Sequence, residues 1–209
     1  MQNMTYFSTG TLFDIAKEAY KRSRENASNN ISNDALVAIV FATSTLEAFM
    51  SQAVSTMKLL THLHPKFELF ANLIGELDSK EIGASLKIKY NMAHWVVCDK
   101  PFDRGSEPYQ SFDLLVNLRN MLIHLKPDKM ASEKIDKLLR QLKAKKLISG
   151  YNPMQRMTWV FFVSTPIVAK WACNTTAKMI QEFWKHTPDE KVKQFFRIHA
   201  NALHYRPID

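Results

Sequence analysis

The sequence has little glycine and little cysteine, and each shortage makes a class of protein improbable. Only 5 of the 209 residues are glycine, which disfavours turn-rich sheet folds. The 2 cysteines, Cys98 and Cys173, lie far apart and form no C-x-x-C pair. That usage suits a reducing compartment and offers no zinc framework. The segment Met1–Gly10 has no basic start and no apolar core, so we expect no signal peptide.

Long uninterrupted hydrophobic runs are also missing. The longest apolar stretch, Ala35–Phe49, contains Glu47 and three consecutive hydroxyl residues, and it is short for a membrane span. We interpret it as the buried central helix of a soluble protein. The sequence therefore predicts a cytoplasmic protein that does not enter a membrane.

Several motifs of common enzymes are absent. The chain has no glycine-rich phosphate loop, no G-x-S-x-G elbow and no paired carboxylates at a useful spacing. His62 and His64 form an H-x-H pair, but no cysteine or further histidine lies near them in the sequence. We therefore expect no metal site and no cofactor.

The hydrophobic residues recur at helical spacing along most of the chain and predict an all-α protein. We expect one domain, 1–209, built as a bundle of about six to eight helices with long antiparallel members. The C-terminal helices, at about 165–199, should pack on the same core. Expected helices cover 11–26, 34–58, about 81–95 from a capping box at Asp78 and Glu81, 109–125, 132–146, 165–185 and 187–199. The stretch 59–78 looks less regular, and 157–163 fits either a short strand or a buried helical turn.

Positive charge is concentrated in one segment. The net charge is +8, and Lys126–Lys146 has eight basic residues opposed by three acidic ones. Within it, 132–146 predicts a basic amphipathic helix. This helix is either a solvated face or a surface that contacts RNA phosphates. The candidate RNA-binding residues are Lys126, Lys129, Lys134 and Lys137.

The helix predicted at 109–125 has the residues best suited to chemistry. Its leucines form a stripe toward the core, and Arg119, Asn120 and His124 project away from that stripe. His124 lies in the last turn before Pro127, where the unsatisfied carbonyls favour a protonated imidazole. Such a histidine suits proton transfer near neutral pH.

Glu47 is the only charged residue between Asp34 and Lys58. A carboxylate in so apolar a helix needs a partner if it is buried, because an unpaired buried charge is costly. We expect that partner to be Arg119 or His124. Glu47 would then orient that side chain, either as a purely structural pair or in support of catalysis.

The stretch from Leu114 to Pro127 reads LLVNLRNMLIHLKP and resembles the R-x4-6-H motif of the HEPN superfamily, with a polar residue directly after the arginine. Arg119, Asn120 and His124 match the motif position for position. The stretch from Ala35 to Met50, ALVAIVFATSTLEAFM, resembles a second helix found in many bacterial members. Together the two stretches cover about 30 residues.

The resemblance implies a metal-independent endoribonuclease in which the arginine and histidine face a cleft between two subunits. Attack by the 2′-hydroxyl on the adjacent phosphate then leaves a 2′,3′-cyclic phosphate. Arg119 and His124 would be catalytic, with Asn120 and Glu47 supporting them. A homodimer, an RNA substrate and an antitoxin or nucleotidyltransferase-like partner are expected, in a toxin–antitoxin or phage-defence role. A non-catalytic dimeric scaffold that binds a partner or a nucleotide remains the alternative.

Overall fold

The computed structural model describes residues 8–26, 31–124, 129–152, 158–187, 189–190, 192–194 and 205–209. Within these residues the chain folds into helices and their connections, so the all-α prediction is confirmed. The helices are α1 (Ser8–Glu25), α2 (Asn33–Leu59), α3 (Pro65–Leu77), α4 (Leu86–Cys98), α5 (Tyr109–His124), α6 (Lys129–Ala144), α7 (Val160–Val163) and α8 (Pro166–Lys185).

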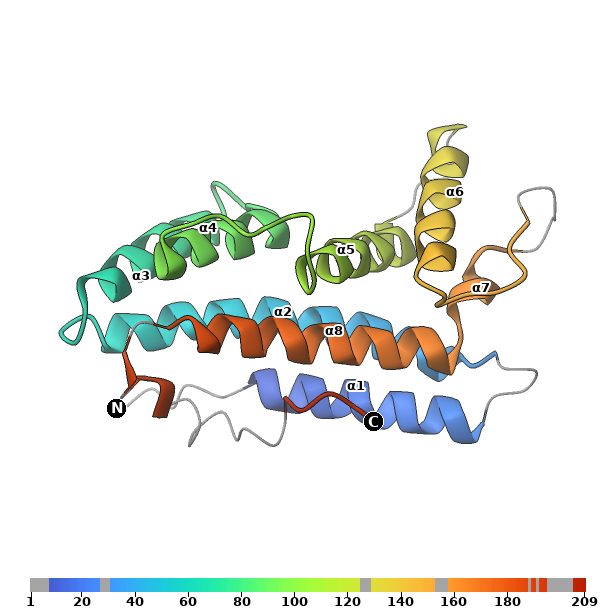
Figure 1. The fold of residues 1–209 in the computed structure, drawn as a ribbon, viewed down its shortest axis with the longest axis horizontal. Helices are drawn as coiled ribbons and strands as arrows, with labels where there is room; N and C mark the ends of the chain where they lie inside the picture. The colour runs from blue at the N-terminus through green and yellow to red at the C-terminus, as the bar shows by residue number, and fades with distance from the viewer. Residues whose placement is uncertain are drawn as a thin grey trace.

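Helices α2 and α8 lie side by side in the middle of the molecule, with α1 against one side of them and α3, α4 and α5 across the other (Figure 1). Alanines at positions 35, 38, 42 and 53 of α2 are buried, and such small side chains let neighbouring helices approach closely. Thr176 of α8 donates a hydrogen bond of 3.0 Å to the carbonyl of Ala42. By length and composition α2 is also the one described helix that suits a membrane span, although 56% of its apolar window is buried.

The directions of the long helices follow from their contacts. Thr9 near the start of α1 bonds Gln52 late in α2, so these two helices run in opposite directions. Helices α2 and α8 run the same way, because the backbone of Ser32 bonds Ser164 just before both helices begin. The central pair therefore differs from the antiparallel packing that the sequence led us to expect.

Side-chain caps set the starts of α2, α3, α4 and α8. Ser32 accepts a hydrogen bond from the backbone of Asp34 at α2, and Thr165 accepts one from Val168 at α8. The sequence offers Asn33 or Ser32 as the cap of the helix expected at 34–58, and Thr165–Pro166 as the cap and N1 proline of the helix at 165–185. The structure has Ser32 as the first cap and confirms Thr165 and Pro166 at the second. The helix expected from Thr187 to about His199 lies largely outside the described residues.

Two predictions in the middle of the chain were wrong. Residues 59–78 contain the regular helix α3, which Pro65 starts and which the ring of His64 caps by accepting from the backbone of Lys66. Helix α4 begins at Leu86 with Ser85 as its cap, and not after Asp78. The ambiguous stretch 157–163 contains the helical turn α7, and residue 157 lies outside the described residues.

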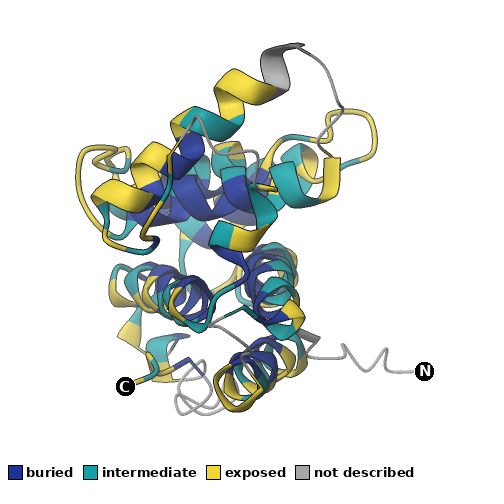
Figure 2. Cartoon of the chain, turned by 90° about the vertical axis from the view of Figure 1, so that its right-hand side faces the viewer, coloured by how far each residue is buried: buried dark blue, intermediate teal, exposed yellow. Residues whose placement is uncertain are grey.

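Helix α6 stands away from the other helices and meets the end of α5 (Figure 1). Leu138, Leu139 and Leu142 are buried, while the opposite face is exposed, as the amphipathic pattern predicts. Figure 2 shows the exposed residues along its projecting part.

Candidate functional site

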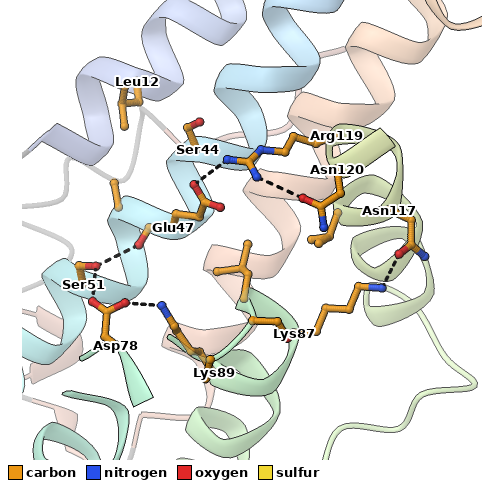
Figure 3. Close-up of a pocket in the computed structure, with 15 residues that line it drawn as sticks. Leu12, Ser44, Glu47, Ser51, Asp78, Lys87, Lys89, Asn117, Arg119 and Asn120 are labelled. Atoms are coloured by element: carbon orange, nitrogen blue, oxygen red, sulfur yellow. Dashed lines mark hydrogen bonds and ion pairs between the residues drawn. The ribbon is translucent and has the colours of Figure 1, made fainter. Parts of the chain in front are cut away.

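The site is built where the last turns of α5 face the middle of α2. Nη2 of Arg119 lies 3.3 Å from Oε2 of Glu47, and Nη1 of Arg119 donates to Oδ1 of Asn120 at 3.1 Å. The close-up shows the guanidinium of Arg119 held between these two side chains (Figure 3). The partner expected for Glu47 is therefore Arg119, and not His124.

The Arg119–Glu47 pair is only partly shielded from solvent. The Arg119 side chain is 19% exposed and that of Glu47 is 43% exposed. An ion pair with this much water contact contributes about 1 kcal/mol or less to stability. Nε of Arg119 is buried and has no hydrogen-bond partner. The guanidinium thus retains a donor that protein groups leave unused.

A second set of polar residues faces the pair from α3, α4 and α5. Lys87 lies 2.6 Å from a carboxylate oxygen of Asp113 and donates to Asn117 at 2.7 Å. Lys89 pairs with Asp78, whose other oxygen accepts a hydrogen bond of 3.1 Å from Ser51. Figure 3 shows Lys87 extending toward Asn117 and Lys89 extending toward Asp78, so the two ammonium groups point in different directions.

These side chains surround a cavity of about 820 Å³ that is open to solvent on one side. Its polar lining comes from Ser44, Glu47, Ser51, Asp78, Ser85, Lys87, Lys89, Asn117, Arg119 and Asn120. The lining holds three cationic groups and two carboxylates, and each cation is paired: Arg119 with Glu47, Lys89 with Asp78, and Lys87 with Asp113, which lies outside the lining. Guanidinium, ammonium and hydroxyl donors are the groups that bind phosphate oxygens.

Sequence reasoning missed the two lysines of α4, Lys87 and Lys89. Lys87 and Lys89 stand two residues apart just after Ser85, the cap of α4. Because the sequence prediction began this helix after Asp78, it did not place the two lysines in its first turn. Asn117 shares the predicted outward face with Asn120, and both line the cavity.

His124 lies elsewhere. It is exposed at the end of α5, next to Ile123, which is 46% exposed, and it does not line the cavity. Five helical positions separate it from Arg119, which means roughly 7.5 Å along the axis and about 140° around it. Within one chain, the structure does not bring Arg119 and His124 together.

The candidate RNA-binding lysines belong to the α6 region. Lys134 and Lys137 are exposed on α6, whereas Lys126 lies outside the described residues and only the backbone of Lys129 is described. Neither Lys134 nor Lys137 lines the cavity. Both lie on the exposed face of α6, apart from the cavity residues.

Metal-binding clusters of histidine, cysteine and carboxylates are absent from the part of the chain that the structure describes. His64 has its own role as the cap of α3. Burial raises the pKa of Cys98 to about 11 and that of Cys173 to about 12. Both thiols are therefore protonated near neutral pH, which disfavours a cysteine nucleophile.

Comparison of the chain with protein-family models, with curated protein sequences and with solved structures gave no match.

Proposed function

We propose that this protein is a metal-independent endoribonuclease of the HEPN type that acts as a homodimer. The single observation that carries the proposal is the placement of Arg119. It stands in an open, hydroxyl-lined cavity beside two lysines, and its side chain stays partly exposed there. A phosphodiester is the anion that such a cavity would hold in an RNA-cleaving protein.

Each motif residue then has a chemical role. Arg119 grips the phosphate and stabilises the charge that develops as the 2′-hydroxyl attacks. His124 accepts the proton of that hydroxyl or donates one to the leaving oxygen, and a 2′,3′-cyclic phosphate remains. Asn120 and Glu47 hold the guanidinium in place through the contacts described above.

A dimer would supply the histidines that the cavity of a single chain lacks, because Arg119 and His124 of one chain lie apart. One histidine per chain cannot easily serve as both acid and base, whereas two copies supply two imidazoles. The exposed Ile123 and His124 at the end of α5 offer a surface on which a second copy can pack. In this proposal the basic face of α6 guides RNA toward the seam, in a cytoplasmic toxin–antitoxin or phage-defence system.

The test is a cleavage assay with purified protein and single-stranded RNA in EDTA, followed by identification of the product ends. We expect cyclic phosphate ends, and a loss of about 100-fold or more for Arg119→Ala and for His124→Ala. Arg24→Ala and His62→Ala are matched controls, because both side chains are exposed and remote from the cavity lining. Cleavage that EDTA stops would rule out the mechanism.

A second function, a non-catalytic module that binds a nucleotide or a partner, is favoured by one observation. Glu47 and Asn120 already engage the guanidinium of Arg119, and His124 lies outside its cavity. This module would bind a nucleoside triphosphate or RNA with strong salt dependence and release it unchanged. Binding without product in the same assay would select it.

A further inference from the structure

A second hollow lies where the end of α6, the turn α7 and the start of α8 meet, at the right-hand end of the molecule in Figure 1. Its volume is about 690 Å³, and it shares no lining residue with the Arg119 cavity. We call it the α6–α8 groove. Its lining consists of Ile31, Lys143, Lys146, Leu147, Ile148, Ser149, Gly150, Phe161, Phe162, Thr165, Pro166 and Ile167.

Large apolar side chains of this groove face solvent. Ile167 is 61% exposed and Phe161 is 46% exposed, although Val168 and Val163 on the same two helices are fully buried. The floor and walls of the groove are anchored to the rest of the fold. Ile148 is 7% exposed, and the backbone bond between Ser32 and Ser164 joins two of its walls. A supported, exposed apolar hollow is typical of a surface that another molecule covers.

The charge at the groove has one sign. Lys143 and Lys146 are exposed at its rim, and the lining contains no carboxylate. Lys143 donates to the carbonyl of Tyr151 at 3.3 Å, and the ammonium has two further hydrogens to offer. Helix α8 also begins at this groove, and the N-terminus of a helix favours negative charge. An occupant that complements this groove is therefore apolar in the middle and acidic at its margin.

We propose that the α6–α8 groove binds an acidic, amphipathic segment of another protein. Large apolar side chains of that segment lie against Phe161 and Ile167, and its carboxylates pair with Lys143 and Lys146. This inference goes beyond the proposed ribonuclease activity and does not depend on it, because the two sites have no residue in common.

RNA fits this groove less well than such a segment. Bases stack on aromatic faces, yet most of the apolar lining is isoleucine, leucine and proline, on which a base gains little. Phosphates would also lose hydration over this apolar floor without enough cations to replace it. Aliphatic side chains of a protein segment match the same floor directly.

The test uses the full chain and two labelled synthetic peptides of about 16 residues, or roughly four helical turns. One peptide has leucines along one face and glutamates flanking them, and its twin has lysines in place of the glutamates. We expect the acidic peptide to bind at least about tenfold more tightly than the twin, with an affinity that falls as salt is added.

Groove variants locate the binding. Ile167→Glu should weaken the acidic peptide by about tenfold or more, because it removes apolar contact and adds a like charge. Acidic residues are well tolerated in a first helical turn, so this variant should keep its fold. Lys143→Ala tests the charge alone and should weaken binding about threefold. Leu59→Glu, at a side chain 72% exposed outside the groove, should change nothing.

Three results would overturn the proposal. They are no measurable binding of the acidic peptide, equal binding of the lysine twin, or unchanged binding by both groove variants. An oligouridylate of about 16 nucleotides is the competitor for the other class of ligand. If it displaces the peptide and loses affinity in Ile167→Glu, the groove belongs to RNA and the protein-segment proposal fails. If it leaves the peptide bound, the assignment stands.

Discussion

Glu47 and Arg119, 72 residues apart in the sequence, join α2 to α5 through an ion pair of 3.3 Å. The carboxylate of Glu47 is the one acidic group in the apolar middle of α2, and the guanidinium of Arg119 extends toward it from α5. The pair fixes the direction of the guanidinium at the edge of the cavity. Nε of the same guanidinium stays buried without a hydrogen-bond partner.

The first prediction concerns this pair. A double-mutant cycle with Glu47→Gln and Arg119→Ala should give a coupling of about 0.5 kcal/mol in the free energy of unfolding, because water screens the half-exposed carboxylate. Urea denaturation followed by circular dichroism measures it. RNA cleavage should respond differently, with Glu47→Gln retaining part of the activity that Arg119→Ala abolishes.

Glu47 would not be a positioning residue if Glu47→Gln cleaved RNA at the wild-type rate. A coupling of several kcal/mol would show that the pair is far less hydrated than its exposure indicates. Glu18→Gln is a suitable control, since it alters an exposed carboxylate on α1 outside the cavity.

The second prediction tests whether two copies of His124 act on one phosphodiester. When wild-type protein is mixed with an equal amount of His124→Ala and subunits exchange, about one quarter of the dimers retain both histidines. If acid and base come from different chains, cleavage should fall to about one quarter of the activity of undiluted wild-type protein at the same total concentration.

A fall to about one half would instead mean that each chain acts alone. His62→Ala is the matched partner for the control mixture, because it replaces an exposed histidine away from α5. That mixture should retain full activity at every ratio.

The third prediction concerns acid stability. His94 is buried on α4, stacks on Phe102 and donates from Nδ1 to the carbonyl of Lys100 at 2.8 Å. Burial lowers the pKa of His94 below its usual 6.5, with a further lowering from His186 and an opposing effect of the Lys100 hydrogen bond. The unfolded chain therefore takes up a proton at a higher pH than the folded chain does.

The free energy of unfolding should accordingly fall as the pH drops below about 6.5, since the stabilising contribution of neutral His94 is lost on the acid side. Urea midpoints at pH 7.5 and pH 5.5 measure this slope. His94→Asn retains a donor for the Lys100 carbonyl and should flatten the slope, whereas His62→Asn should leave it unchanged. An equal slope in His94→Asn and the wild type would assign the acid sensitivity to other groups.

Local signals in the sequence predicted much of the helical framework. Ser32 and the pair Thr165–Pro166 marked the starts of α2 and α8, because side-chain capping and the fixed φ of proline act within a few residues. The need of a lone acidic residue for a partner predicted that Glu47 pairs with Arg119 or His124, and the structure shows the pair with Arg119. Both inferences follow from costs that operate wherever the helices pack.

The remainder depends on contacts that neighbouring residues do not encode. A histidine cap at His64 is an uncommon start signal, and it concealed α3 behind an apparently irregular stretch. Lys87 and Lys89 join the site only because α4 crosses α2 beside α5, and the sequence does not state that crossing. The parallel course of α2 and α8 likewise comes from tertiary packing, not from the pattern within either helix.

The position of α2 has a consequence for how the protein is made. One flank of this helix is covered by α1, which the ribosome has already delivered, but the other is covered by α8, which emerges only after Pro166 has been added. A nascent or truncated chain that ends before α8 thus leaves a long apolar stripe without its cover. Such a chain needs a chaperone to stay dispersed, and a stop codon ahead of α8 turns the central helix into a nucleus for aggregation.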